Sequence, residues 1–120
     1  MALDSAPQVQ DVAPQDVTPA EEFPRILYVE DNDTNYLVAE GMLGDIFNLT
    51  RASNARNFVD TVNTEHFDLI LMDIELAGSE LDGIELTRLM RGRLEDAPDF
   101  TSSVATFSTP IIFITAHTAM

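Results

Sequence analysis

The chain has 120 residues, 45% of them hydrophobic, and a formal net charge of −15 at pH 7. Length and composition predict one globular domain, whereas 21 acidic side chains against six arginines and no lysine argue against nucleic-acid binding, which needs clustered cations. The sequence also lacks cysteine, a signal peptide and any apolar run long enough for a membrane span, so we expect a cytoplasmic protein without disulfides.

Residues 1–23 differ in composition from the rest of the chain. They are rich in Pro, Gln, Asp and Ala, and they contain no basic residue. Such a segment does not bury enough apolar surface to offset the entropy cost of ordering it, so we predict a disordered acidic tail. The alternative interpretation is a peptide that docks on a partner protein.

Short apolar runs alternate with amphipathic segments over residues 24–120, which we expect to form the folded domain. The runs have the length of strands buried on both faces, and the segments repeat apolar residues at helical spacing. In chain order the predicted elements are a strand over 25–29, a helix over 35–45, a strand over 47–52, a helix over 55–63, a strand over 67–73, a helix over 84–94, a loop over 95–109 and a strand over 110–115. Strands alternating with helices predict an α/β fold with a parallel sheet.

Polar residues mark the points where the predicted helices begin. Asp33 or Thr34 is suited to cap the first helix, and the pair Ser53–Asn54 is suited to cap the second. Met42 and Met90 stand at helical spacing among apolar residues, and we interpret both as core residues.

Three of the predicted strands end in polar side chains that are able to carry chemistry. Glu30 and Asp31 follow the first strand, Asp73 ends the third, and Thr115 ends the last. Because the carboxyl ends of parallel strands face a common crevice, these side chains converge if the strands are neighbours. Carboxylates gathered in a partly buried pocket either raise their pKa values or hold a cation, and Mg²⁺ is the hard, oxygen-binding ion that fits.

A carboxylate in such a pocket is able to act as the nucleophile in phosphoryl transfer and to form an acyl phosphate. A hydroxyl such as that of Thr115 would then hydrogen-bond the phosphoryl oxygens. Taken alone, each residue also has a structural interpretation, since an acidic residue after a strand is usually a turn or cap residue. The coincidence of three strand ends favours the chemical interpretation.

Four blocks of the sequence resemble the signature blocks of response-regulator receiver domains from two-component systems. The blocks are Ile26–Asn32, Leu69–Ile74, Asp82–Leu86 and Pro110–Ala116. The first block, followed by Asn35, is most similar to receivers attached to hybrid histidine kinases. The resemblance implies a doubly wound, flavodoxin-like parallel sheet with strand order 2-1-3-4.

The resemblance also implies a role for each residue at the strand ends. Asp73 would accept a phosphoryl group from a phosphohistidine of a histidine kinase or a phosphotransfer protein. The implied Mg²⁺ ligands are Asp31, Asp73, Glu30 acting mainly through water, and the backbone carbonyl of Glu75; the implied phosphoryl contacts are the Thr115 hydroxyl and the Ala116 amide, with Glu75 and His117 flanking the group. The domain would be a signalling module with an output through protein contacts, not an enzyme with an external substrate.

The chain departs from the receiver pattern in its last third. Receivers of this family have five strands and five helices, whereas these residues supply about four strands and lack the lysine that pairs with the phosphoryl group. We therefore expect a receiver truncated at its C-terminus, in which the strand over 111–115 is an exposed sheet edge. Such an edge predicts a homodimer or a partner protein that covers the last strand.

Two other functions remain open from the sequence. A degenerate receiver that no longer takes up phosphate would act only as a dimerisation or docking adaptor, which the absence of lysine favours. An aspartyl phosphatase would use Asp73 as the nucleophile and Glu75 as acid and base, but the pairs Glu30–Asp31 and Asp82–Gly83 fit a receiver better.

Overall fold

In the computed structural model of the chain, residues 23–114 are described. The predicted tail over residues 1–23 therefore lies, apart from Phe23, outside the described residues. The same is true of Thr115, Ala116 and His117.

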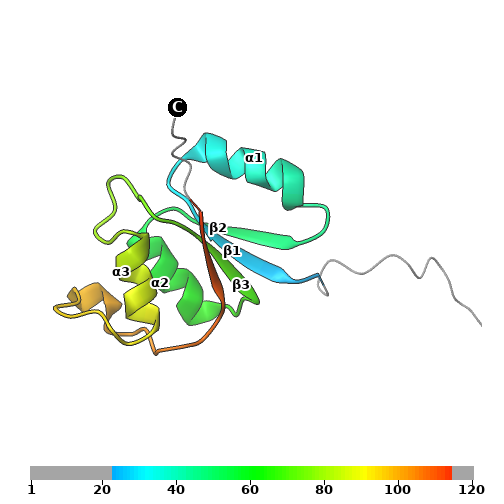
Figure 1. The fold of residues 1–120 in the computed structure, drawn as a ribbon. Helices are drawn as coiled ribbons and strands as arrows, with labels where there is room; N and C mark the ends of the chain where they lie inside the picture. Colours follow the sequence, from blue (N-terminus) through cyan, green and yellow to red (C-terminus); the bar gives the residue numbers. More distant parts are fainter. Residues whose placement is uncertain (1–22, 115–120) are drawn as a thin grey trace, which may run out of the picture.

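Four parallel strands form one sheet in the order β2-β1-β3-β4, as the sequence predicts (Figure 1). The strands are β1 (Arg25–Val29), β2 (Asn48–Ala52), β3 (Leu69–Asp73) and β4 (Ile111–Ile114). In the register, Tyr28 of β1 lies beside Arg51 of β2 and Leu71 of β3. Because β1 and β3 are parallel neighbours, the residues at their carboxyl ends meet at one edge of the sheet.

Helices cover both faces of the sheet, which makes the fold doubly wound. The helices are α1 (Asp33–Leu43), α2 (Ala55–Thr64) and α3 (Gly83–Met90), with a 3₁₀ turn, η3 (Asp99–Thr101), in the loop before β4. In Figure 1, α1 lies on one side of the sheet, and α2 and α3 lie together on the other. None of the helices among the described residues is long and apolar enough to cross a membrane.

Successive residues of each inner strand point to opposite faces, so both faces of the sheet are apolar. Toward α2 and α3, the strand residues Leu27, Val29, Ile70 and Met72 pack in one cluster with Phe58, Val59, Leu86 and Met90. Toward α1, a smaller cluster contains Ile26, Tyr28 and Leu71, with Tyr36, Ala39 and Leu43 of α1 packed against it. This two-sided burial explains the uninterrupted apolar runs in the sequence.

The face that α1 turns to the sheet differs from the prediction. Met42 is 73% exposed, and Leu37 and Val38 are exposed as well, so the interpretation of Met42 as a core residue is wrong. The helix packs through Tyr36, Ala39 and Leu43. Because apolar residues stand on almost every side of this helix, its sequence does not define the side that is buried.

The N-terminus of α1 also differs from the prediction. The N-cap is Asn32, whose side-chain oxygen accepts a hydrogen bond of 2.8 Å from the backbone N–H of Asn35. Asn and Asp are almost equally favoured at this position, so the sequence could not choose between Asn32 and Asp33. The cap of α2 is Asn54, in agreement with the prediction.

Helix α3 ends four residues before the predicted limit at Leu94, because Gly92 adopts a left-handed backbone with φ of 74°. The loop that follows is tied back to the helix by Arg91, whose guanidinium donates hydrogen bonds to the carbonyls of Phe107 (2.6 Å) and Thr109 (2.7 Å). The loop also contributes to the core through the partly buried side chains of Phe100, Val104 and Phe107. It is therefore a packed segment of the fold.

Candidate functional site

Three carboxylates meet where β1 and β3 end. Glu30 and Asp31 come directly after β1, and Asp73 is the last residue of β3. One carboxylate oxygen of each residue lies within 4.8 Å of the oxygens of the other two. The convergence predicted from the strand ends is confirmed for these three side chains. We call Glu30, Asp31 and Asp73 the acidic cluster.

Glu30 is fully buried, at 0% exposure, and each of its carboxylate oxygens accepts a hydrogen bond. Oε1 accepts from the Tyr28 hydroxyl at 2.9 Å, and Oε2 accepts from the backbone N–H of Asn32 at 3.1 Å. The backbone of Glu30 is held as well, because its N–H donates to the carbonyl of Ala52 at 2.9 Å. A buried carboxylate is costly unless it is hydrogen-bonded, and these two donors fix its orientation.

Asp73 is buried at 5% exposure, and burial raises the pKa of its carboxyl group to about 6. The hydrogen bond that Asp73 Oδ1 accepts from the backbone N–H of Glu75, at 3.2 Å, opposes this shift. Hydrogen bonding to Glu30 and the negative charges of Glu30 and Asp31 raise the pKa further. The site therefore gathers negative charge that it does not itself neutralise.

Three arginines of the described residues form ion pairs away from the acidic cluster. Ion pairs join Arg25 to Glu65, Arg51 to Asp33 and Arg56 to Glu80, and between residues 23 and 114 no arginine forms an ion pair with the acidic cluster. Three carboxylates at one sheet edge, with no ion-pair partner among residues 23–114, supply the hard oxygen donors that Mg²⁺ requires. The donor set therefore fits a divalent cation of this kind.

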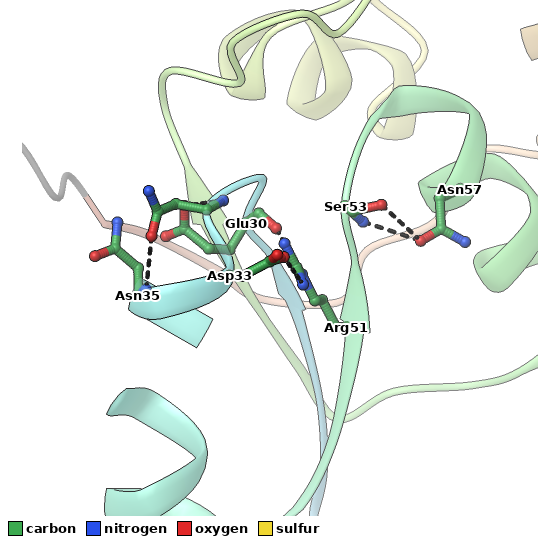
Figure 2. A network of polar contacts seen from close by, with 7 residues as sticks. Glu30, Asp33, Asn35, Arg51, Ser53 and Asn57 are labelled. Atoms are coloured by element: carbon green, nitrogen blue, oxygen red, sulfur yellow. Dashed lines mark hydrogen bonds and ion pairs between the residues drawn. The ribbon is translucent and has the colours of Figure 1, made fainter. Parts of the chain in front are cut away.

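Arg51 supports the site from β2 and was not among the residues selected from the sequence. Its Nε donates to the backbone carbonyl of Glu30 at 2.9 Å, and a terminal nitrogen donates to Asp33 Oδ1 at 2.7 Å. Figure 2 shows this side chain reaching from β2 to Asp33 at the start of α1. The guanidinium also lies over the Tyr36 ring, 5.4 Å from its centroid. Arg51 thus holds the loop after β1 against β2 and α1.

Asp82 and Gly83 position the start of α3 against the backbone of the site. Asp82 is exposed and caps α3, and its side chain and that of Glu85 exchange hydrogen bonds with each other's backbone N–H groups. Gly83 is buried, and its N–H donates to the carbonyl of Ile74 at 3.0 Å. A Cβ at Gly83 would overlap the carbonyl oxygen of Asp73 and stand 2.9 Å from Met72 Cγ. Only glycine lets α3 begin so close to Asp73.

The other residues selected from the sequence are only partly described. Glu75 donates its backbone N–H to Asp73, and its side chain is exposed. Thr115 and Ala116 lie outside the described residues, but Ile114, directly before them in the sequence, is the partner of Asp73 in the register of β3 and β4. The N–H of Ile74 donates to the carbonyl of Ile114 at 3.2 Å, which joins the end of β4 to the site.

Residues 26–120 match the family model of the response regulator receiver domain. The chain belongs to this family. The fold inferred from the sequence resemblance is therefore confirmed, and the domain is a signalling module of two-component systems.

Curated relatives of this receiver are histidine kinases. Histidine kinase 5 of Arabidopsis thaliana is 38% identical over 69 residues, which are 57% of this chain and 7% of the kinase. The sensor protein GacS of Pseudomonas syringae pv. syringae is 34% identical over 95 residues, which are 78% of this chain and 10% of GacS. The receiver thus spans a tenth or less of the length of these relatives.

A solved structure supports the fold independently. The receiver domain of the Francisella response regulator 1452 superimposes with a TM-score of 0.60 at 21% sequence identity, over 78% of this chain and 66% of the other. At this identity the likeness establishes the shared fold alone.

Proposed function

We propose that this receiver accepts a phosphoryl group on Asp73 in the cytoplasm, from a phosphohistidine of a histidine kinase or a phosphotransfer protein, with Mg²⁺. The observation that carries the proposal is the acidic cluster, whose carboxylate oxygens lie within 4.8 Å of one another at the end of β1 and β3. Membership of the receiver family and the likeness to histidine kinases support the choice of donor.

In the proposed transfer, a carboxylate oxygen of Asp73 attacks the phosphorus atom. A P–O bond forms as the P–N bond of the phosphohistidine breaks, and the histidine nitrogen keeps the electron pair of that bond. The nucleophile must be ionised, so donation from the Glu75 N–H to Asp73 Oδ1 assists by favouring the charged form. The product is an acyl phosphate.

The remaining residues have supporting roles in the proposal. Asp31, Asp73 and the Glu75 carbonyl would hold Mg²⁺, with Glu30 acting mainly through water. Bound Mg²⁺ would neutralise the charge of the phosphoryl oxygens. The Thr115 hydroxyl and the Ala116 amide would hydrogen-bond the phosphoryl group, and the side chains of Glu75 and His117 would flank it.

A phosphate-transfer assay tests this function against the adaptor alternative. The receiver is incubated with a histidine phosphotransfer protein that carries ³²P on its histidine, in Mg²⁺ or in EDTA. We expect label on the receiver only in Mg²⁺, and none on an Asp73→Asn variant. Equal labelling of that variant would contradict the proposed acceptor, and a folded receiver that takes no label would favour the adaptor.

A further inference from the structure

Tyr28 connects the acidic cluster to the apolar core of the sheet. It stands on β1, two residues before Glu30, and its side chain lies on the face of the sheet that α1 covers. Its ring is buried at 4% exposure in the cluster with Ile26 and Leu71. Its hydroxyl donates to Glu30 Oε1 at 2.9 Å. The hydroxyl of Tyr28, a residue of an otherwise apolar strand, thus hydrogen-bonds a carboxylate of the acidic cluster.

Tyr28 has neighbours from both adjacent strands and from α1. The strands on either side place Arg51 and Leu71 beside it, and the Tyr36 ring lies 6.0 Å from the Tyr28 ring, centroid to centroid. Burial, and then the hydrogen bond to Glu30, raise the pKa of the Tyr28 phenol well above its usual range.

Glu30 receives its hydrogen bond at Oε1 from Tyr28. The Tyr28 hydroxyl donates to Oε1 and the Asn32 N–H donates to Oε2, while Asp73 is the neighbour of Glu30 within the acidic cluster. Asn32 is in the loop after β1, whereas Tyr28 is in the centre of the sheet. Two donors on separate oxygens set the plane of the carboxylate, and each oxygen keeps a lone pair for water or a metal ion.

We propose that Tyr28 is a positioning residue, whose hydroxyl orients the Glu30 carboxylate for Mg²⁺ binding at the acidic cluster. This inference rests on the proposed function. Hydrogen bonds from outside a metal's own ligands orient those ligands, and their loss typically weakens metal binding about 10- to 100-fold. Tyr28→Phe removes the hydroxyl and keeps the buried ring, which makes it the appropriate variant.

Mg²⁺ affinity measured by calorimetry tests the proposal through a double-mutant cycle. We expect Tyr28→Phe to raise the Kd for Mg²⁺ about 10-fold, and Tyr36→Phe, the matched control, to leave it unchanged. In a Glu30→Gln background, Tyr28→Phe should have no further effect, because the hydroxyl acts through Glu30. If Tyr28 had only a structural role, Tyr28→Phe would lower the melting temperature in EDTA. It would not raise the Kd for Mg²⁺ in a way that depends on Glu30.

A second measurement does not depend on the folding of the Tyr28 variant. The chain has two tyrosines, so the Tyr36→Phe variant reports on Tyr28 alone. We expect its tyrosine fluorescence to change on titration with Mg²⁺, with the same Kd that calorimetry gives. Unchanged fluorescence, or a Tyr28→Phe variant that binds Mg²⁺ as tightly as the natural chain, would overturn the role of Tyr28 and leave the proposed function intact. A natural chain that binds no Mg²⁺ would overturn both.

Discussion

Asp73 is deeply buried and lies beside the negative charges of Glu30 and Asp31, and both features raise the pKa of its carboxyl group. Burial and repulsion keep its carboxyl group protonated to about pH 6, although the reaction proposed for it requires the ionised form. A bound cation would favour the ionised form, because an opposite charge stabilises it. Metal binding and readiness to accept a phosphoryl group are therefore coupled at this residue.

The raised pKa of Asp73 predicts how stability depends on pH without metal. The folded chain holds a proton on Asp73 up to about pH 6, whereas the unfolded chain releases it near pH 3.8. The folded state thus binds more protons in this window, and the free energy of unfolding falls as pH rises through it. In the natural chain, the free energy of unfolding should fall by an amount on the order of 2 kcal/mol between pH 4 and 7, measured by urea unfolding in EDTA. Asp73→Asn should remove this fall. An unchanged slope in the variant would contradict the buried, repelled carboxyl group.

Asp31 provides a test of the metal site that is independent of phosphoryl transfer. Mg²⁺ at 100 times its Kd should stabilise the folded chain by about 2.7 kcal/mol, seen as a higher melting temperature. Asp31→Asn should abolish this rise, because it removes a carboxylate of the cluster. Asp60→Asn is the matched control, since Asp60 is an exposed residue of α2 outside the cluster. Equal stabilisation of both variants by Mg²⁺ would place the cation elsewhere.

At the scale of secondary structure, the sheet and the start of α3 build the site together. Parallel pairing of β1 and β3 brings the acidic cluster together, and the β3–β4 register places Ile114 beside Asp73. The N-terminus of α3 then approaches the backbone of Asp73 through Gly83. The site depends on this close approach as much as on its carboxylates.

Gly83→Ala should therefore destabilise the receiver by about 2 kcal/mol or more, since the new methyl group meets the Asp73 carbonyl and the Met72 side chain. The backbone shift should also weaken Mg²⁺ binding. Gly41→Ala is the matched control, because a Cβ there meets nothing within 4 Å and alanine is the better helix former. Chemical unfolding measures both effects, and a neutral Gly83→Ala variant would refute the close approach.

Much of this architecture could be predicted from the sequence, because strands buried on both faces appear as apolar runs of clear length. The apolar runs before Glu30 and Asp73 predicted β1 and β3, and the acidic residues at their carboxyl ends predicted the acidic cluster. The buried face of α1 could not be predicted, because apolar residues surround that helix. Nor could the roles of Tyr28 and Arg51, because each acts through a contact to Glu30 that exists only once the chain is folded.

At the scale of the whole molecule, β4 is the most exposed part of the described sheet. Ile112 and Phe113 point to opposite faces and are 52% and 43% exposed. Between residues 23 and 114, β4 pairs with β3 on one edge and with no strand on the other. An apolar strand with a free edge is a template for pairing with another chain.

We therefore propose that β4 mediates association, with a second copy or with a partner that covers this edge. Light scattering at tens of micromolar should give a mass above the 13.3 kDa of one chain, and Ile112→Lys should lower it because a charge disfavours edge pairing. The control Leu37→Lys places the same charge on the exposed side of α1. A monodisperse monomer would contradict association between copies.

The central claim is that Asp73 is the phosphoacceptor, and chemical trapping of the acyl phosphate tests it most directly. The receiver is incubated with Mg²⁺ and acetyl phosphate, reduced with sodium borohydride, which converts an aspartyl phosphate to homoserine, and analysed by peptide mass spectrometry. We predict homoserine at position 73, absent when Mg²⁺ is replaced by EDTA. Phosphate retained on a serine or threonine, or homoserine at Asp31 in place of Asp73, would contradict the account.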